Sequence, residues 1–490
     1  MIFDYKYCLH FTTIACYAMI LKKILTTLLI TGCLQSAFSQ VVLSTHNLDL
    51  KKSRDHHEIL AAPEAKNRGV VVFASDKNTV TALQYTRVLY YKDSLATSRP
   101  DADEYDFMAG YSYNESGQPS AYWASADYTK IQELHFDFDT KTVTDYSFAL
   151  PFTDEQILST FSENNYFYII TLPKLGSKLK LYAFYEGRYL LRLLDFSTFA
   201  FKDADNNPTT LSKLLGQYSV QKIDKAYTPL PPAAAKVKLY VSEKTIQFTF
   251  DQNPAYTQVF TVNTSTYGVT EKIIPQLVVD EGTSNSFLHN DKLYQVTLND
   301  KELMISATNA VTGQLLKSYE ATKEDTITFK NSPLLEQTGN RKSNEFKNTK
   351  KFLRKASSGD AAVSVYQTPN DIMVVTGTIR NITPTGDLIL GAMMTGAVIA
   401  SGVGNGDMSG MFPGNTQSIY FESLFDDNFN HKPLPQQRLA ADYIGQYIAG
   451  HEKAVSMETV FKYDYYYVLG FYDVKAKKYV MVKFQDDFVE

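Results

Sequence analysis

The hydrophobic and polar positions of the chain alternate from residue 67 onward in short segments that are rich in Tyr, Phe, Val, Ile and Thr. Alternation with a period of two residues is typical of a β-strand that buries one face. Predicted strands of this kind lie at residues 70–74, 79–85, 166–172, 236–241, 245–250, 292–298 and 465–472. Helical periodicity is rare and predicts short helices only at residues 209–215, 344–356 and 435–449. The pattern therefore predicts an all-β protein with a few inserted helices.

A polar turn followed by a closing strand recurs along the chain. Such turns lie near Asp93, Asp139, Glu186, Thr264, Val311, Asp427 and Val474, so that successive turns are 46, 47, 78, 47, 116 and 47 residues apart. Four of the six intervals agree within one residue, and the two long ones contain the segments 201–235 and 340–414. A long all-β chain has to manage the edges of its sheets by closure or by repetition, and the regular interval favours repetition.

A four-stranded unit of about 40–50 residues that repeats several times resembles the blade of a β-propeller. The best single instance is residues 287–319, where His289-Asn290-Asp291-Lys292 resembles the opening turn of many propeller repeats. No WD dipeptide, kelch double glycine or Asp-box recurs, so the resemblance is to β-propellers in general. It implies a single β-propeller of about seven four-stranded blades at residues 67–490, with inserts at 201–235 and 340–414 that project from one face. Six or eight blades, or a double β-sandwich, stay open as alternatives.

The first forty residues have the pattern of a bacterial export signal. Lys22 and Lys23 precede a short apolar stretch at residues 24–30, and a small-x-small cleavage site follows at residues 37–39. Residues before Met19 do not fit such a signal, which predicts a true start at Met19. Alternatively, residues 30–33 resemble a lipobox, in which Cys33 becomes a lipidated N-terminus. Both interpretations predict a periplasmic, outer-membrane-associated or extracellular protein, with residues 41–66 as an N-terminal linker.

Composition excludes several classes of protein. The 30 Phe and 34 Tyr supply too much apolar area for a disordered chain, and 53 acidic against 48 basic residues leave no basic footprint for nucleic acid. Because Cys8, Cys16 and Cys33 are the only cysteines, the rest of the chain forms no disulfide and no cysteine-ligated zinc site. Removal of residues 1–40 takes away three lysines and one aspartate, which shifts the net charge from −5 to −7.

One short segment resembles the opening of a calcium loop. Asp203, Asp205 and Asn207 offer oxygen atoms at alternate positions, as such loops do. The resemblance ends there, because Pro208 takes the place of the glycine and Leu214 that of the bidentate glutamate. The three residues are therefore weak candidates for a metal site, and a polar turn that caps the next helix is the favoured interpretation. No other cofactor is predicted.

Two further polar clusters favour structural interpretations. His135, Asp137 and Asp139 share one face of a predicted strand, which is typical of the solvated face of an outer strand. Residues 55–58 (Asp-His-His-Glu) are adjacent in sequence and point in opposite directions on an extended chain, so a solvated linker is favoured over a metal cluster.

A basic segment stands out in this acidic chain. Residues 341–355 contain seven basic residues and one acid, Glu345. On a helix, Lys350, Lys351 and Arg354 would offer positive charge to an acidic partner or to anionic lipid. A solvated helix that packs on the rest of the fold is the alternative.

The second unusual segment is rich in glycine and methionine and runs from residue 386 to 414. Its stretch at residues 388–400 is uncharged but too short to span a membrane as a helix. Exposed methionines suit adaptable binding surfaces. The segment is therefore a candidate partner-binding surface, and its candidate residues are Leu388, Met393, Met394, Met408 and Met411. A packed hairpin is the alternative.

No familiar catalytic motif is present: serine-nucleophile elbow, HExxH, Walker A and Rossmann glycine patterns are all missing. The sequence therefore predicts an exported, non-catalytic propeller that is an interaction or scaffold module of the cell envelope. Its expected partner is an envelope protein or a cell-surface ligand, with peripheral membrane contact or a lipid anchor at Cys33. The alternative is an envelope hydrolase or lyase with carboxylates at the propeller channel. Carboxylates that converge with a basic group there would favour the enzyme.

Overall fold

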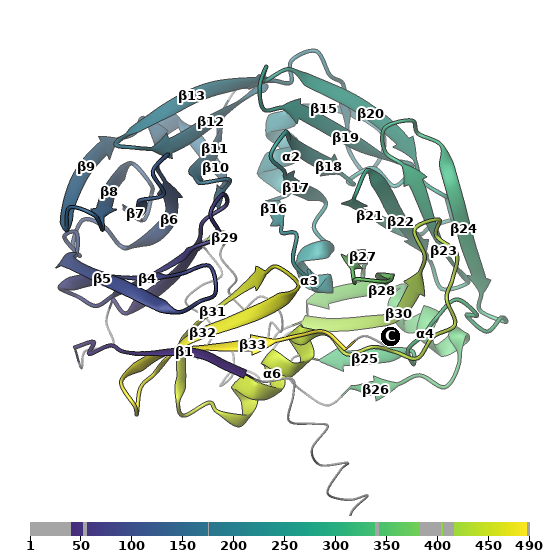
Figure 1. The fold of residues 1–490 in the computed structure, drawn as a ribbon. Helices are drawn as coiled ribbons and strands as arrows, with labels where there is room; N and C mark the ends of the chain where they lie inside the picture. The colour runs from purple at the N-terminus through teal and green to yellow at the C-terminus, as the bar shows by residue number, and fades with distance from the viewer. Residues whose placement is uncertain are drawn as a thin grey trace, which may run out of the picture.

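The structure is a computed structural model that describes residues 41–51, 56–174, 176–338, 343–381, 403–404 and 416–487. Antiparallel sheets of four or five strands follow one another along this part of the chain and stand in a ring around a common centre (Figure 1). The strands nearest the centre are largely buried, whereas the outermost strands are largely exposed. The fold is a β-propeller, as the sequence repeat predicts.

The first three sheets of the ring are built from strands in sequence order. The first contains β2 (Glu58–Pro63), β3 (Val70–Ser75), β4 (Thr79–Tyr85) and β5 (Tyr91–Ser98). The second contains β6 (Phe107–Tyr113), β7 (Pro119–Ala124), β8 (Lys130–Asp137) and β9 (Thr142–Ala149). The third contains β10 (Glu155–Glu163), β11 (Tyr166–Pro173), β12 (Lys178–Tyr185) and β13 (Arg188–Asp195), with η1 (Phe152–Asp154) before them. A two-residue strand, β29 (Val403–Gly404), pairs in parallel with the inner strand β10.

The next sheet is extended by a strand from an insert. It contains β16 (Val220–Ile223), β17 (Val237–Val241), β18 (Thr245–Phe250), β19 (Tyr256–Asn263) and β20 (Val269–Pro275). β16 pairs in parallel with β17. Before β16 the chain forms the hairpin β14 (Phe201–Lys202) and β15 (Pro208–Thr209), then α2 (Leu211–Gln217). The following sheet is regular, with β21 (Thr283–His289), β22 (Lys292–Leu298), β23 (Glu302–Asn309) and β24 (Leu315–Thr322).

The last two sheets use strands that are distant in sequence. One has β27 (Asp360–Gln367), β28 (Ile372–Asn381) and β30 (Thr416–Phe425), and its outer side is formed by the earlier strands β25 (Leu335–Thr338) and β26 (Asn344–Glu345). The other has β31 (Val455–Tyr463), β32 (Tyr466–Asp473) and β33 (Lys478–Phe484), and its outer strand is β1 (Val41–Asn47). Pairing of β1 with β33 joins the two ends of the described chain and closes the ring (Figure 1).

Apolar side chains fill the spaces between neighbouring sheets. The single tryptophan, Trp123 of β7, is fully buried in one cluster with Phe73 of β3 and Phe136 of β8. The helix α6 (Ala440–Gly450) packs against the last two sheets, because its Ile444 lies in a cluster that contains residues of both β28 and β32. Burial of such clusters is the main favourable term of folding.

Local sequence patterns predicted the strands well. β4, β18 and β22 have the predicted bounds. The predicted turns at Asp139, Glu186, Thr264 and Val311 lie between the third and fourth antiparallel strands of their sheets. These hairpins are local, so neighbouring residues determine them.

Three of the predicted turns are wrong in position or role. Asp93 lies inside β5, because the hairpin turn is at residues 86–90. No closing strand follows Asp427, since β25 already occupies that place in the sheet. Val474 lies between the second and third strands of the last sheet, whose fourth strand is β1.

Predictions about the N-terminal part and about both inserts are also wrong. Residues 41–66 are not a linker, because they contain β1 and β2 and thereby parts of two sheets. The insert 201–235 does not simply project from a face: β16 and the short helix α3 (Leu230–Ala233) lie near the centre of the ring (Figure 1). Leu230 and Ala233 are buried there, with α3 against β27 and β28. The insert 340–414 does not simply project from a face, because it contains β27 and β28, the two inner strands of one sheet of the ring.

All three predicted helices begin later than expected, α2 by two residues and the other two by five. α4 (Thr349–Ala356) starts after Asn348, whose side chain accepts a hydrogen bond of 3.0 Å from the Lys351 N–H, while residues 344–345 form β26. α6 starts at Ala440, where the carboxylate of Asp442 accepts a hydrogen bond of 2.9 Å from the Leu439 N–H. In α4 the N-cap side chain accepts a backbone N–H of the first turn, whereas in α6 the side chain of the third helical residue accepts the N–H of the N-cap residue.

Candidate functional site

The enzyme alternative requires carboxylates and a basic group at the centre of the ring. β16 brings Lys222 to Glu163 at the end of β10, with 3.7 Å between Nζ and Oε2. Lys222 also pairs with Asp224, and Lys225 lies 3.2 Å from Glu163 Oε1. Burial lowers the pKa of Lys222, but the two carboxylates outweigh burial and hold that pKa above its usual value. The four groups neutralise one another, and they fasten β16 to β10.

A second group of carboxylates lies beside α6. Burial, with the charge of Asp442 next, raises the pKa of Glu422 to about 7. Gln436 donates a hydrogen bond of 2.7 Å to Glu422, and burial also raises the pKa of Asp442. Carboxyl groups with raised pKa values are suited to proton transfer near neutral pH. Near the centre, carboxylates and basic groups converge in the cluster around Lys222, as the enzyme alternative expects. Glu422 lies away from that cluster, on β30, the third strand from the inner edge of its sheet.

A fully buried ion pair in the sheet of β17 is linked to the sheet of β21 by hydrogen bonds with Asn285 and Ser286. Lys238 Nζ lies 2.9 Å from Asp251 Oδ2 and 2.6 Å from Asn285 Oδ1, with the Lys238 and Asp251 side chains 0% and 1% exposed. Thr257 and Ser286 donate hydrogen bonds of 2.7 and 3.0 Å to the same carboxylate. Both charged groups have hydrogen-bond partners and are enclosed by the protein, so the pair has a structural role. Sequence patterns did not reveal it, because Asn285 and Ser286 belong to the next sheet.

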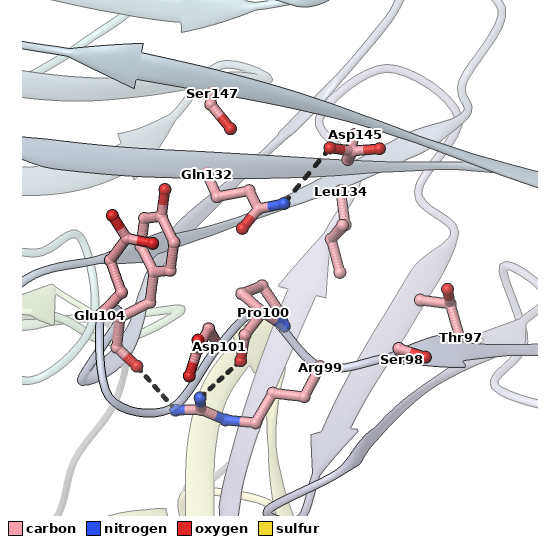
Figure 2. Close-up of a pocket in the computed structure, with 11 residues that line it drawn as sticks. Thr97, Ser98, Arg99, Pro100, Asp101, Glu104, Gln132, Leu134, Asp145 and Ser147 are labelled. Atoms are coloured by element: carbon pink, nitrogen blue, oxygen red, sulfur yellow. Dashed lines mark hydrogen bonds between the residues drawn. The ribbon is translucent and has the colours of Figure 1, made fainter.

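A polar pocket of about 450 Å³ lies on the outside of the ring, between the first two sheets (Figure 2). Its floor is the Arg99 guanidinium, which donates hydrogen bonds of 2.9 and 3.0 Å to the carbonyls of Pro100 and Tyr105. Glu104 at the rim pairs with Lys130 at 2.6 Å, and Gln132 donates a hydrogen bond to Asp145 at 3.3 Å. The arginine thus supports the loop that forms the pocket wall.

Glu58 lies near Arg99 at the start of β2. One of its oxygen atoms accepts a hydrogen bond of 2.7 Å from the Met108 N–H of β6. Burial raises the pKa of Glu58 to about 7, although that hydrogen bond and the charge of Arg99 lower it. The sequence placed Glu58 in a solvated linker, but the residue joins the first two sheets. Its neighbours lie about forty and fifty residues further along the chain, so no local pattern indicated this.

The basic segment forms an amphipathic helix, as predicted. Phe352 and Leu353 of α4 are buried in the core, whereas Lys351 and Arg354 are exposed. Within the described part of the chain neither of these two cations forms an ion pair, whereas Lys350 lies 3.8 Å from Glu324. An adjacent pocket of about 380 Å³ is lined by charges of both signs; its charged lining residues are Lys323, Glu324, Asp325, Lys330, Glu345, Lys347 and Lys350.

The weak calcium candidates form a tight turn between β14 and β15. Asp203 Oδ1 accepts hydrogen bonds of 3.0 Å from the Asp205 N–H and 2.8 Å from the Asn207 N–H. This is the polar turn that the sequence favoured, although Thr210 rather than the turn caps α2. Among the residues that the structure describes, no three His, Cys, Asp or Glu side chains are grouped to hold a metal ion.

The residues of the other polar strand have separate partners. His135 Nδ1 lies 3.0 Å from Ser120 Oγ, and Asp137 accepts the N–H groups of Asp139 and Thr140 at 2.9 and 3.0 Å. They are structural contacts. The methionine-rich candidates lie outside the described residues, as does Cys33; the candidates are Leu388, Met393, Met394, Met408 and Met411.

No protein-family model and no curated protein sequence matches the chain. Solved structures that are similar include cobalt-substituted ACO, the apocarotenoid oxygenase of Synechocystis, at 8% identity and a TM-score of 0.28 over 55% of this chain and 62% of that chain. The β-propeller domain of Cps50 (Swd1) from Myceliophteria thermophila has 7% identity and a TM-score of 0.31 over 90% of this chain and 99% of that one. Virginiamycin B lyase of Staphylococcus aureus has 11% identity and a TM-score of 0.25 over 68% and 96%.

The chain thus spans about three fifths of the length of the apocarotenoid oxygenase structure. Identities this low say nothing about activity. In the part of the chain that the structure describes, no helix is long and apolar enough to span a bilayer.

Proposed function

We propose that the protein is an exported, non-catalytic β-propeller that is an interaction or scaffold module of a bacterial cell envelope. The observation that supports this most is the contrast between the centre and the surface. Near the centre, Lys222 is neutralised by Glu163 and Asp224, and the chain's own α3 packs on β27 and β28. On the outside, Lys351 and Arg354 are exposed on α4 without an ion pair to any described residue. Unneutralised surface charge of one sign favours a partner of the opposite sign.

The number of blades is part of this proposal. Each of the sheets with four or five strands is a blade, which gives seven blades with the hairpin β14–β15 as an appendage. The last blade is closed by β1, and closure between the two ends of the chain prevents the ring from opening at an unpaired edge.

Export is supported by the leader pattern and by the position of β1. The strand begins at Val41, two residues after the end of the proposed cleavage motif at residues 37–39. Cleavage there would leave the whole of β1 in the mature protein. Lipidation of Cys33 would instead leave seven residues between the lipidated cysteine and β1, a tether of roughly 25 Å at full extension. Mass spectrometry of the mature N-terminus separates the two.

The binding surface is tested by charge reversal on α4. Immobilised wild-type protein and the variant Lys351→Glu/Arg354→Glu are incubated with a detergent-solubilised envelope fraction of the source bacterium. The matched control is Lys77→Glu/Lys244→Glu, which changes the net charge equally at exposed lysines elsewhere. At low salt we expect wild type and the control to retain a partner from the envelope fraction and the α4 variant to retain much less of it. Equal loss in both variants would contradict a specific surface.

A second candidate function is favoured by Glu422, whose pKa of about 7 lies in the range of a general acid or base. This is the envelope hydrolase or lyase, with Glu422 of β30 as the acid. Because β30 is the third strand from the inner edge of its sheet, the catalytic group would lie away from the channel. It predicts that the purified protein cleaves a polysaccharide or peptide and that Glu422→Gln stops the cleavage. Turnover with that dependence would replace the non-catalytic proposal.

A further inference from the structure

The outermost strand of the third sheet, β13, has an unusually apolar edge. It is the terminal strand in the order β13-β12-β11-β10-β29, so one side of its backbone has no strand partner among the described residues. Five of the six residues at positions 189–194 are apolar, and Tyr189, Leu191 and Leu193 are 37%, 41% and 54% exposed. β13 has charges at its two ends, Arg188 and Asp195, and one inside, Arg192. The outermost strands β5, β20 and β24 each have two charges inside the strand. Soluble proteins use such residues to prevent strands from pairing edge to edge.

The hairpin register determines which backbone groups of β13 face the open side. β12 and β13 are joined by the two-residue turn Glu186-Gly187, in which both residues have positive φ angles, and Tyr185 pairs with Arg188. In such a hairpin the pair beside the turn is hydrogen-bonded, and hydrogen-bonded and open pairs then alternate. The N–H and C=O groups of Tyr189, Leu191 and Leu193 therefore point away from β12. The same three residues place their side chains on one face of the sheet.

We propose that β13 is the contact surface for a second copy of this chain, through antiparallel pairing of the two β13 strands around Leu191. In this register Leu191 of one copy lies opposite Leu191 of the other, and Tyr189 lies opposite Leu193. Each of these pairs joins residues whose backbone groups face the open side, as a hydrogen-bonded antiparallel pair requires. The two apolar faces would then form one continuous surface.

The charges of the strand favour this register over its neighbours. A shift by two residues in either direction places arginine opposite arginine, as Arg192 opposite Arg192 or Arg188 opposite Arg192, and like charges in that position are destabilising. In the proposed register Arg192 lies opposite Leu190. The other charges of β13 already have local partners, with Arg188 Nη2 3.5 Å from Glu186 and Asp195 2.8 Å from Lys178. Arg192 itself stacks on Tyr267 at 5.2 Å. In this register the edges of two β13 strands can therefore pair without placing like charges opposite each other.

Sedimentation of the full chain over a range of concentrations tests the proposal. We expect a concentration-dependent dimer, and we expect Leu191→Lys to weaken it more than about tenfold because the two lysines would face each other at the symmetry axis. Leu315→Lys is the matched control, since Leu315 is 49% exposed on the outermost strand β24 of another sheet. Leu193→Lys is a second variant in case Leu191→Lys does not fold, as judged by circular dichroism.

The register is tested by a disulfide. In a chain whose Cys8, Cys16 and Cys33 are replaced by serine, Leu191→Cys introduces the only thiol. Paired strands bring the two Leu191 Cα atoms to about 5.5 Å, which is within reach of a disulfide. We expect oxidation to produce a covalent dimer with Leu191→Cys and not with Leu315→Cys. A monomer at every concentration, equal loss of dimer in the Leu315→Lys control, or a dimer without the Leu191 crosslink would overturn the proposal. Capture of an unrelated strand-forming peptide by a monomeric chain would overturn it too.

Discussion

Glu58 is a residue whose environment is made by distant parts of the chain. Its carboxyl group is held by the Met108 N–H and lies near Arg99, and burial raises its pKa to about 7 from a usual value near 4.5. The sequence identified the acid but not its burial, because the residues that cover it are supplied by the next sheet. The opposite holds for Asp203, where the sequence predicted the polar turn correctly, since the hydrogen-bond partners Asp205 and Asn207 lie within four residues.

The raised pKa of Glu58 predicts a pH-dependent stability. The folded protein binds the proton more tightly than the unfolded chain, so this stabilisation is complete below pH 4.5 and is lost as the pH rises through about 7. Glu58→Gln keeps an acceptor for the Met108 N–H and has no charge to bury. We expect the free energy of unfolding of wild type to fall relative to that of the variant by about 1–3 kcal/mol between pH 5 and pH 8.

Urea unfolding at several pH values measures this difference. Glu115→Gln is the control, because Glu115 is an exposed acid on the turn after β6. A constant difference between wild type and Glu58→Gln across the pH range would contradict the assignment.

At the scale of strands and sheets, the hairpins were predictable and the sheet order was not. The turn at Glu186 follows from local residues, and so does β22. By contrast, β25 and β1 each complete a sheet whose other strands lie far away in sequence, and β16 joins its sheet in parallel. Non-local pairing depends on the packing of the whole ring, which a periodic pattern of apolar residues does not encode.

The buried pair Lys238–Asp251 allows a prediction of how much stability is lost when a buried charge loses its partner. Lys238→Met removes the cation and leaves Asp251 buried without its charge partner, so we expect a loss of about 3–5 kcal/mol in the free energy of unfolding. The double variant Lys238→Met/Asp251→Leu removes both charges and should recover part of that loss.

Denaturant unfolding of the two variants and wild type completes the comparison. The control is Lys477→Met, which breaks the exposed pair with Asp49 and should change stability by no more than about 1 kcal/mol. If the double variant were less stable than Lys238→Met, the loss of unfolding free energy would come from the side chains that surround the pair and not from the unpaired charge of Asp251.

At the scale of the whole molecule, closure of the ring depends on the seven residues of β1, Val41–Asn47. β1 pairs along its length with β33 and supplies the outer strand of the last sheet. Leu43 packs against the apolar cluster shared with the first sheet, and His46 stacks on Tyr91 of β5 with 4.1 Å between the ring centroids. A chain that begins at residue 48 leaves the edge of β33 unpaired and weakens the junction between the last and first sheets.

We therefore expect removal of all residues up to and including 47 to lower the midpoint of thermal unfolding by several degrees or more. We also expect it to promote aggregation through the open edge of β33. A chain that begins at residue 41 keeps all of β1 and is the matched control. The comparison also bears on export, because a cleavage site within β1 would remove the strand that closes the ring. Equal midpoints for the two chains would mean that β1 is dispensable for closure. The ring would then be held by its inner strands and by the packing of α6 alone.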